Sequence, residues 1–236
     1  MPAAAMSRKS ALSNKPARSS RSDAKPATRD LILDTAEHLF AERGFFGVSV
    51  RDITDAAGLR LASVNYYFGT KDDLLKAVVQ RRFQEIDAER QEMFAALEPR
   101  LAKMSKREIV GQVVDIFMLP ILSRVTSGEP GWTAYAKIIA HGSNVELWAT
   151  GILASVLDPA AREFLDLLRL AYPEADDHSI YCAYELMIGA MSHALGQNAR
   201  IDTLSGGKYR SSDLALIYPK ARAFAVGGMI AICGVR

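Results

Sequence analysis

The sequence predicts an all-α protein in which a small N-terminal head is joined by a long helix to a larger helical body. Apolar residues recur at helical spacing in most segments, and no segment alternates with period two for long enough to form a strand. Breaks containing Gly and Pro divide these segments. At 236 residues, 49% hydrophobic and 24% charged, the chain has an ordinary globular balance and enough length for one or two domains.

The head is predicted from three helical patterns. The first spans about residues 29–43, with Thr28 as its N-cap. The second follows the cap Ser49 and ends at Gly58, because glycine adopts the left-handed conformation at little cost. The apolar stripes of the second and third helices are Val50, Ile53 and Ala57, then Leu61, Val64 and Phe68. Such a helix-turn-helix with a polar and aromatic outer face is the arrangement that places a recognition helix in the DNA major groove.

A long helix is predicted over residues 71–97, closed by Pro99 and roughly 40 Å long at 1.5 Å per residue. That length is enough to join the head to a separate body. Gly- and Pro-containing breaks, such as the one before Pro159, divide the body into further helices. These are expected at residues 106–124, 131–141, 145–157, 159–171, 177–199 and 219–233.

Four short motifs in the head resemble the N-terminal domain of the TetR family of bacterial transcriptional regulators. They are Arg-Gly-Phe at 43–45, Ala-Gly at 57–58, Tyr-Tyr-Phe at 66–68 and Thr-Lys-Asp-Asp-Leu at 70–74, in the family's order and spacing. The similarity covers roughly residues 28–79. The resemblance implies a helix-turn-helix DNA-binding domain at 28–75 and a helical effector-binding and dimerisation domain at 76–236. It also implies a repressor that a small lipophilic effector, neutral or with one polar end, releases from DNA.

The resemblance further implies which residues bind duplex DNA at a partly palindromic operator. They are Arg51, Arg60, Leu61, Ala62, Ser63, Asn65, Tyr66, Tyr67 and Lys71. Residues 60–63 would read bases, and residues 65–67 would contact phosphates and adjoining bases. Lys71 would contact a phosphate, and Arg51 would reach a base edge or a phosphate. Arginine is the usual bidentate reader of guanine, and hydroxyls and amides bind phosphate oxygens, so the residue types agree. Many family members have histidine where this chain has Tyr67. The alternatives are that Tyr66 packs half-buried and that Arg51 and Lys71 are merely solvated.

Residues 1–27 are predicted to form a disordered basic arm, since they contain Ala, Ser, Lys, Arg and Pro but almost no large apolar side chains. Asp23 is the single acid there, and the net charge of the whole chain is only +2, so the remainder is net acidic. A basic arm on an acidic body suits a polyanionic partner met at one end. The arm either follows the DNA phosphates or minor groove, or is a solvated tail without a role.

The second half is rich in aromatic and methionine residues with a few polar groups among them, as a small-molecule site between helices requires. The candidate effector-binding residues are Phe117, Trp132, Tyr135, His141, Asn144, Trp148, Tyr184 and Met187. Each of them is also compatible with an ordinary place in the core. The resemblance implies that the last two long helices pair with those of a second copy, giving a homodimer; their apolar stripes could instead face the chain's own core.

Other function classes find little support in the sequence. It has no nucleophile elbow, no phosphate-binding glycine loop and no metal-spaced His, Cys or Asp set, so we expect neither an enzyme nor a cofactor. Cys182 and Cys233 are interpreted as core residues in a reducing cytoplasm. The longest apolar run, 223–235, is too short to span a bilayer, and the basic N-terminus lacks the apolar region of a secretory signal. The alternative to a ligand-controlled regulator is a constitutive DNA-binding or architectural protein with no small-molecule effector.

Overall fold

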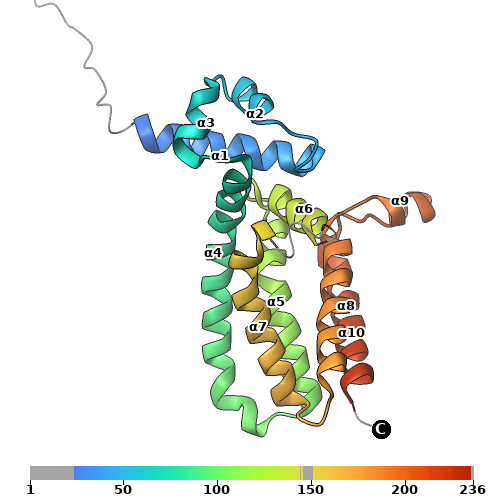
Figure 1. Cartoon of the computed structure of the whole chain (residues 1–236). Coiled ribbons are helices and arrows are strands. Elements are labelled where there is room, and N and C mark those ends of the chain that lie inside the picture. Colours follow the sequence, from blue (N-terminus) through green and yellow to red (C-terminus); the bar gives the residue numbers. More distant parts are fainter. Residues whose placement is uncertain (1–23, 144, 146–150, 235–236) are drawn as a thin grey trace, which may run out of the picture.

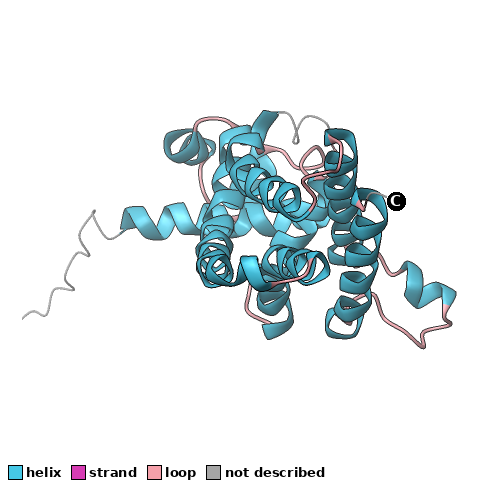
Figure 2. Ribbon diagram, turned by 90° about the horizontal axis from the view of Figure 1, so that it is seen from below, coloured by secondary structure: helices cyan, strands magenta, loops and turns pink. Residues whose placement is uncertain are grey.

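The computed structural model describes residues 24–143, 145 and 151–234, and over these residues every regular element is a helix (Figures 1 and 2). Three helices form the head: α1 (Ala24–Arg43), α2 (Val50–Ala56) and α3 (Leu61–Phe68). The connector α4 (Lys71–Leu97) descends from them and ends in a 3-10 turn, η1 (Glu98–Lys103). The body contains α5 (Lys106–Ser127), α6 (Trp132–Gly142), α7 (Ala154–Ala171), α8 (Asp177–Leu195), α9 (Arg200–Leu204) and α10 (Leu214–Cys233).

Local sequence explains where three of these helices begin. Ser49, Thr70 and Ser105 each cap a helix through a reciprocal capping box with the acid three residues later. The second helix ends as expected, with Gly58 at φ +66° directly after it. Each of these capping signals involves only a few neighbouring residues. The structure confirms the predicted cap Ser49 and the predicted start of α4 at Lys71.

Several predicted boundaries are wrong. α1 begins at Ala24, so Thr28 lies inside the helix and is not its N-cap. α7 continues through Pro159 where a break was expected, because Val156 and Ala160 on either side are buried and their packing outweighs the hydrogen bond that proline cannot donate. α10 starts at Leu214, five residues before Pro219, and the short α9 was not predicted.

The head rests on the body through a buried ion-pair cluster. The carboxylate of Glu37, on α1, is 3% exposed and accepts hydrogen bonds from Arg82 Nε (3.0 Å) and Nη2 (2.9 Å) and from Arg81 Nη2 (3.1 Å) on α4. Arg82 also donates to the carbonyl of Pro130 (3.3 Å), and its guanidinium lies 5.0 Å from the ring centroid of Trp132 at the start of α6. These contacts join α1, α4 and α6.

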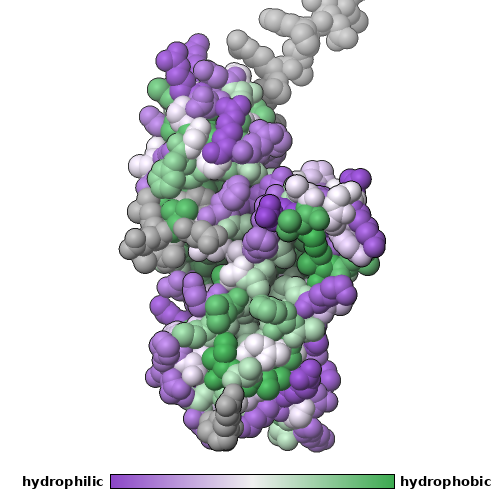
Figure 3. All heavy atoms as spheres, turned by 90° about the vertical axis from the view of Figure 1, so that its right-hand side faces the viewer, coloured by the Kyte–Doolittle hydropathy of each residue, from purple (hydrophilic) through white to green (hydrophobic). Residues whose placement is uncertain are grey.

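Two described helices, α5 and α10, are long and apolar enough to cross a membrane by length and composition alone. α5 is largely buried between its neighbours and is a core helix. α10 packs on α5 and α8 and leaves apolar side chains exposed on the face that Figure 3 presents. The contact with α5 is fixed by Asp115, which pairs with Arg222 (2.5 Å) and accepts a hydrogen bond from Tyr218.

Candidate functional site

The helix-turn-helix presents α3 with one buried and one exposed side. After Gly58, the amide of Leu59 donates to the carbonyl of Thr54 (2.8 Å), and Arg60 enters α3 in an extended conformation with no side-chain cap bond. Val64 alone of α3 is fully buried. The exposed side carries most of the residues that the resemblance assigned to DNA, including Arg60, Leu61, Ala62, Asn65 and Tyr66.

Tyr66 is 70% exposed, so the alternative in which it packs half-buried is wrong. Its ring meets that of Tyr67 edge to face, with centroids 5.0 Å apart, and Tyr67 is itself half-buried against the core, as is Ser63 on the same helix. Arg51 on α2 is exposed and makes only a loose pair with Asp55 (3.8 Å), which leaves its guanidinium accessible.

Lys71 has a role that the sequence did not reveal. Its ammonium donates to the carbonyls of Phe45 (3.0 Å) and Val48 (2.9 Å) and lies 4.1 Å from the centroid of the Phe45 ring. These bonds fix the loop between α1 and α2 to the first turn of α4, so Lys71 is not merely solvated. Two of its three N–H groups are used in this way, and its contact with a DNA phosphate stays a prediction.

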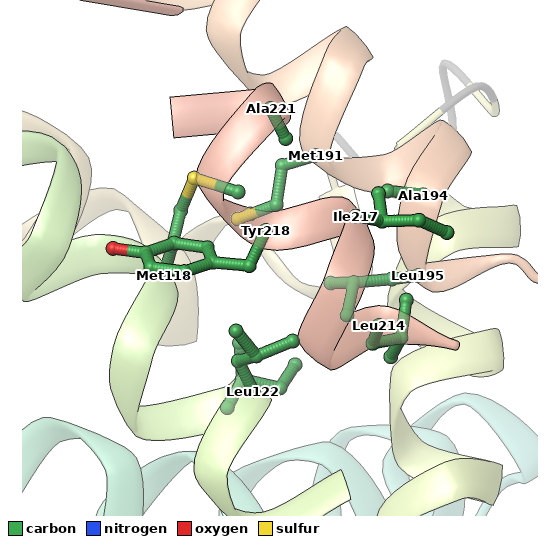
Figure 4. A pocket seen from close by; sticks show the side chains of 10 residues that line it. Met118, Leu122, Met191, Ala194, Leu195, Leu214, Ile217, Tyr218 and Ala221 are labelled. Atoms are coloured by element: carbon green, nitrogen blue, oxygen red, sulfur yellow. The ribbon is translucent and has the colours of Figure 1, made fainter. Parts of the chain in front are cut away.

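The body contains a cavity of about 310 Å³ enclosed by α4, α5, α6, α7 and α8. Apolar side chains line most of it, among them Phe83, Ile86, Phe117, Ile139, Leu153 and Ile188. A second, smaller pocket of about 20 Å³ lies where α10 packs on α5 and α8; Figure 4 shows that Met118, Met191 and Tyr218 crowd it. Of these two, the first has the size and the apolar lining of a small-molecule site.

Of the eight residues predicted for the effector site, the structure brings Phe117, Tyr135 and Tyr184 together in the cavity wall. Trp132 and Met187 are buried but do not line the cavity, and His141 is exposed. Asn144 and Trp148 lie outside the described residues. Met187 and Trp132 are thus core residues, which is the ordinary place for such side chains at helical spacing.

Arg90 is the functional candidate that sequence reasoning missed. It lines the cavity, is 7% exposed, and donates from Nη2 to the carbonyl of Phe117 (3.0 Å). Burial lowers the pKa of its guanidinium, which nevertheless stays charged as arginine does in proteins. The signal was available: Arg90 occupies an apolar position on the α4 stripe, four residues after Ile86 and seven after Phe83.

Two tyrosines and two serines also contribute polar groups to the wall. The hydroxyls of Ser143 and Ser192 are hydrogen-bonded to each other (2.6 Å). Burial raises the pKa of the Tyr135 and Tyr184 hydroxyls, so both remain protonated donors. Among the described residues, no group of three or more His, Cys, Asp or Glu side chains could hold a metal ion.

The fold and the exposed α3 place the chain among helix-turn-helix DNA-binding proteins, and comparisons identify the family. Residues 32–78 match the model of "Bacterial regulatory proteins, tetR family", and residues 115–228 match "Tetracyclin repressor-like, C-terminal domain". The chain therefore belongs to the TetR family of bacterial transcriptional regulators, a class of DNA-binding regulators rather than enzymes.

Individual relatives are similar mainly at the head. The transcriptional repressor KstR2 of Rhodococcus jostii is 33% identical over 72 residues, 30% of this chain and 35% of that protein. The transcriptional regulator PksA of Bacillus subtilis is 27% identical over 176 residues, 74% of this chain and 82% of that protein. The similarity spans only 29% and 35% of the length of two of the curated relatives that the chain matches at the head. A tetR family regulator from Shewanella sp. PV-4 shares the fold, with a TM-score of 0.58 at 18% identity over 89% of this chain and 99% of that one.

Proposed function

We propose that the protein is a homodimeric, cytoplasmic repressor whose operator binding is released by a small lipophilic effector in the α4–α8 cavity. The observation that carries this proposal is that the two helices in contact with the head, α4 and α6, also line the cavity. An effector acts on DNA only if it binds two arrangements of the heads with different affinity. A ligand between these helices meets that requirement, because a shift of α6 alters the contacts of Trp132 with Arg82 and hence with α1.

DNA binding is assigned to the domain 28–75 and, within it, to the nine residues of α2, α3 and the start of α4 that the family resemblance implies. Effector binding and dimerisation are assigned to the domain 76–236. The exposed α3 supports base reading by its N-terminal residues, and the accessible guanidinium of Arg51 supports a contact with a base edge or phosphate. Repression is supported by the similarity of the head to KstR2, which is a transcriptional repressor.

Dimerisation is proposed through α8 and α10. Leu186 on α8 and Phe224 on α10 are 60% and 70% exposed, and a Cβ built on Gly189, Gly227 or Gly228 would meet nothing within 4 Å. These features make an apolar face with room for the close approach of a second helix pair, and Figure 3 shows the apolar surface there. With two heads related by a two-fold axis, the half-site centres should lie about one DNA turn, roughly 34–36 Å, apart or slightly more.

The test of effector control starts from an operator selected from a random duplex library. Alkyl and aromatic compounds are screened by thermal shift, since a ligand of the folded state raises its stability, and those that bind are assayed for operator release by fluorescence anisotropy. Ala160→Leu, which fills part of the cavity, should raise the effector concentration needed for release at least tenfold and leave unliganded operator affinity within about twofold. If no compound binds or releases DNA, the constitutive DNA-binding alternative replaces this proposal.

A further inference from the structure

The charged groups that line the cavity are separated by sign, an arrangement that apolar packing alone would not require. At the buried end lies the guanidinium of Arg90, and at the solvent side lie Asp158, which is half-exposed and loosely paired with Arg162 (3.7 Å), and Glu185, which is exposed. The positive charge is therefore inside, and the negative charges are near water.

Among the described residues, no carboxylate lies within ion-pair distance of Arg90. The bond from Nη2 to the Phe117 carbonyl is its one hydrogen bond to these residues, and its buried Nε has no acceptor. The rings of Phe117 and Phe83, with centroids 4.8 and 5.7 Å from the guanidinium carbon, supply only a weak substitute for a counter-ion. A charge buried in this way is costly unless something pairs with it.

The neighbours of Arg90 in the wall are hydrogen-bond donors. Tyr135 and Tyr184 are the two tyrosines whose hydroxyls interact electrostatically with its guanidinium, and neither hydroxyl is hydrogen-bonded to a described residue. A guanidinium with two nearby hydroxyls is a donor set suited to one planar anionic group, which accepts bidentate bonds from arginine. The described residues that line the cavity include no second cation, so a monoanion fits better than a phosphate dianion.

We propose that the effector is an amphipathic organic acid whose carboxylate pairs with Arg90, with hydrogen bonds from Tyr135 and Tyr184, while its apolar part fills the rest of the cavity. This inference rests on the proposed function and names the chemical class of its effector. It also explains why an arginine occupies an apolar position of α4, because the bound carboxylate supplies the hydrogen-bond acceptors and the counter-charge that the Arg90 guanidinium lacks.

The experiment uses two matched sets of probes with the full-length protein: decanoic acid, decanol and decylamine, and naphthoic acid, naphthylmethanol and naphthylmethylamine. Affinities are measured by calorimetry at about pH 7.5, where the acids are ionised. In at least one set the acid should bind about 10- to 100-fold more tightly than the alcohol, and the amine most weakly. Arg90→Met should abolish the preference for acid over alcohol, and Arg90→Lys should retain part of it.

The matched control is Arg124→Met, which removes a partly buried arginine that is paired with Glu89 and does not line the cavity; this variant should keep the preference for the acid. Arg90→Met should also raise the Tm of the unliganded protein, because it removes an uncompensated buried charge. If that variant does not fold, the ratio of acid to alcohol affinity in the unaltered protein still decides.

Equal binding of acid and alcohol in both sets, a preference that persists in Arg90→Met, or the failure of all six probes to bind would overturn the inference. Neutral compounds that release the operator without any preference for acids would leave the proposed function intact and remove only this inference. Acids that bind through Arg90 but release no DNA would leave the assigned ligand class intact and overturn the proposed effector control.

Discussion

The ion-pair cluster between head and body makes a quantitative prediction for Glu37→Gln. The substitution keeps the shape of the side chain but replaces one carboxylate oxygen by an amide that cannot accept, so at most part of the three hydrogen bonds from Arg81 and Arg82 survives. Breaking a buried pair on one side costs about 3–5 kcal/mol. Both arginines are partly exposed and can rehydrate, which places the expected loss of unfolding free energy at the lower end, about 3 kcal/mol.

Asp34→Asn is the matched control, because Asp34 also pairs with Arg81 (2.7 Å) but is 64% exposed. An exposed pair of this kind contributes about 0–1 kcal/mol. The assay is urea unfolding followed by circular dichroism at fixed protein concentration, since a dimer's stability depends on concentration. In thermal unfolding, the same loss of free energy should lower the Tm of Glu37→Gln by about 6–12 °C for a chain of this length. Equal losses in the two variants would show that burial of the cluster does not determine its strength and would refute the reasoning.

Three further predictions concern DNA binding and assembly. Lys71→Met should lower the unfolding free energy by about 1–3 kcal/mol, because two loop carbonyls lose their donor, and weaken binding to all DNA sequences alike; an altered sequence preference in binding selections would contradict this. Arg60→Ala should leave Tm nearly unchanged yet relax the preference at one base pair by about 1–3 kcal/mol in competition binding, and a uniform loss over all sequences would argue against base reading. Leu186→Glu or Phe224→Glu should yield monomers in analytical ultracentrifugation, whereas Leu31→Glu on the head should stay dimeric; dimers in all three variants would place the interface elsewhere.

The parts of the fold that the sequence predicted well are those specified by a few neighbouring residues. The capping boxes at Ser49 and Thr70, and the positive φ of Gly58, are local physical requirements that can be read directly from residue type and spacing. The boundaries at Pro159 and Pro219 were missed for the opposite reason. A proline disfavours a helix interior by a local rule, and only tertiary packing of the surrounding apolar residues, which the sequence does not display, outweighs that rule.

The candidate site likewise has one part that the sequence predicted and another that depends on tertiary packing. A short amphipathic pattern predicted that Asn65 and Tyr66 lie on the exposed face of α3, but it also placed Leu61 on the apolar stripe, whereas Leu61 is exposed. The cavity is formed by five helices, and which aromatic side chains meet there depends on the relative rotation of those helices. Tyr135 and Trp132 were both predicted to line the site, but only Tyr135 does so, whereas Trp132, three residues earlier on the same helix, contacts Arg82 of α4. Lys71 shows that one residue can belong to the binding surface by position and to the core loop by its hydrogen bonds.

That rotation of α6 has a functional consequence. Trp132 contacts Arg82 of α4, which in turn holds Glu37 of the head, while Tyr135 and Ile139, one and two turns further along, line the cavity. A rigid helix of 11 residues thus joins the cluster that holds α1 to the place where Arg90 lacks a carboxylate partner among the described residues. An acid that binds Arg90 would draw on contacts from α6 and α4 together, and its binding free energy could be used to shift one helix against the other. A coupling of about 2.7 kcal/mol is enough for a hundredfold loss of operator affinity, and it lies within the range of about 1–3 kcal/mol that is usual for coupling between two sites.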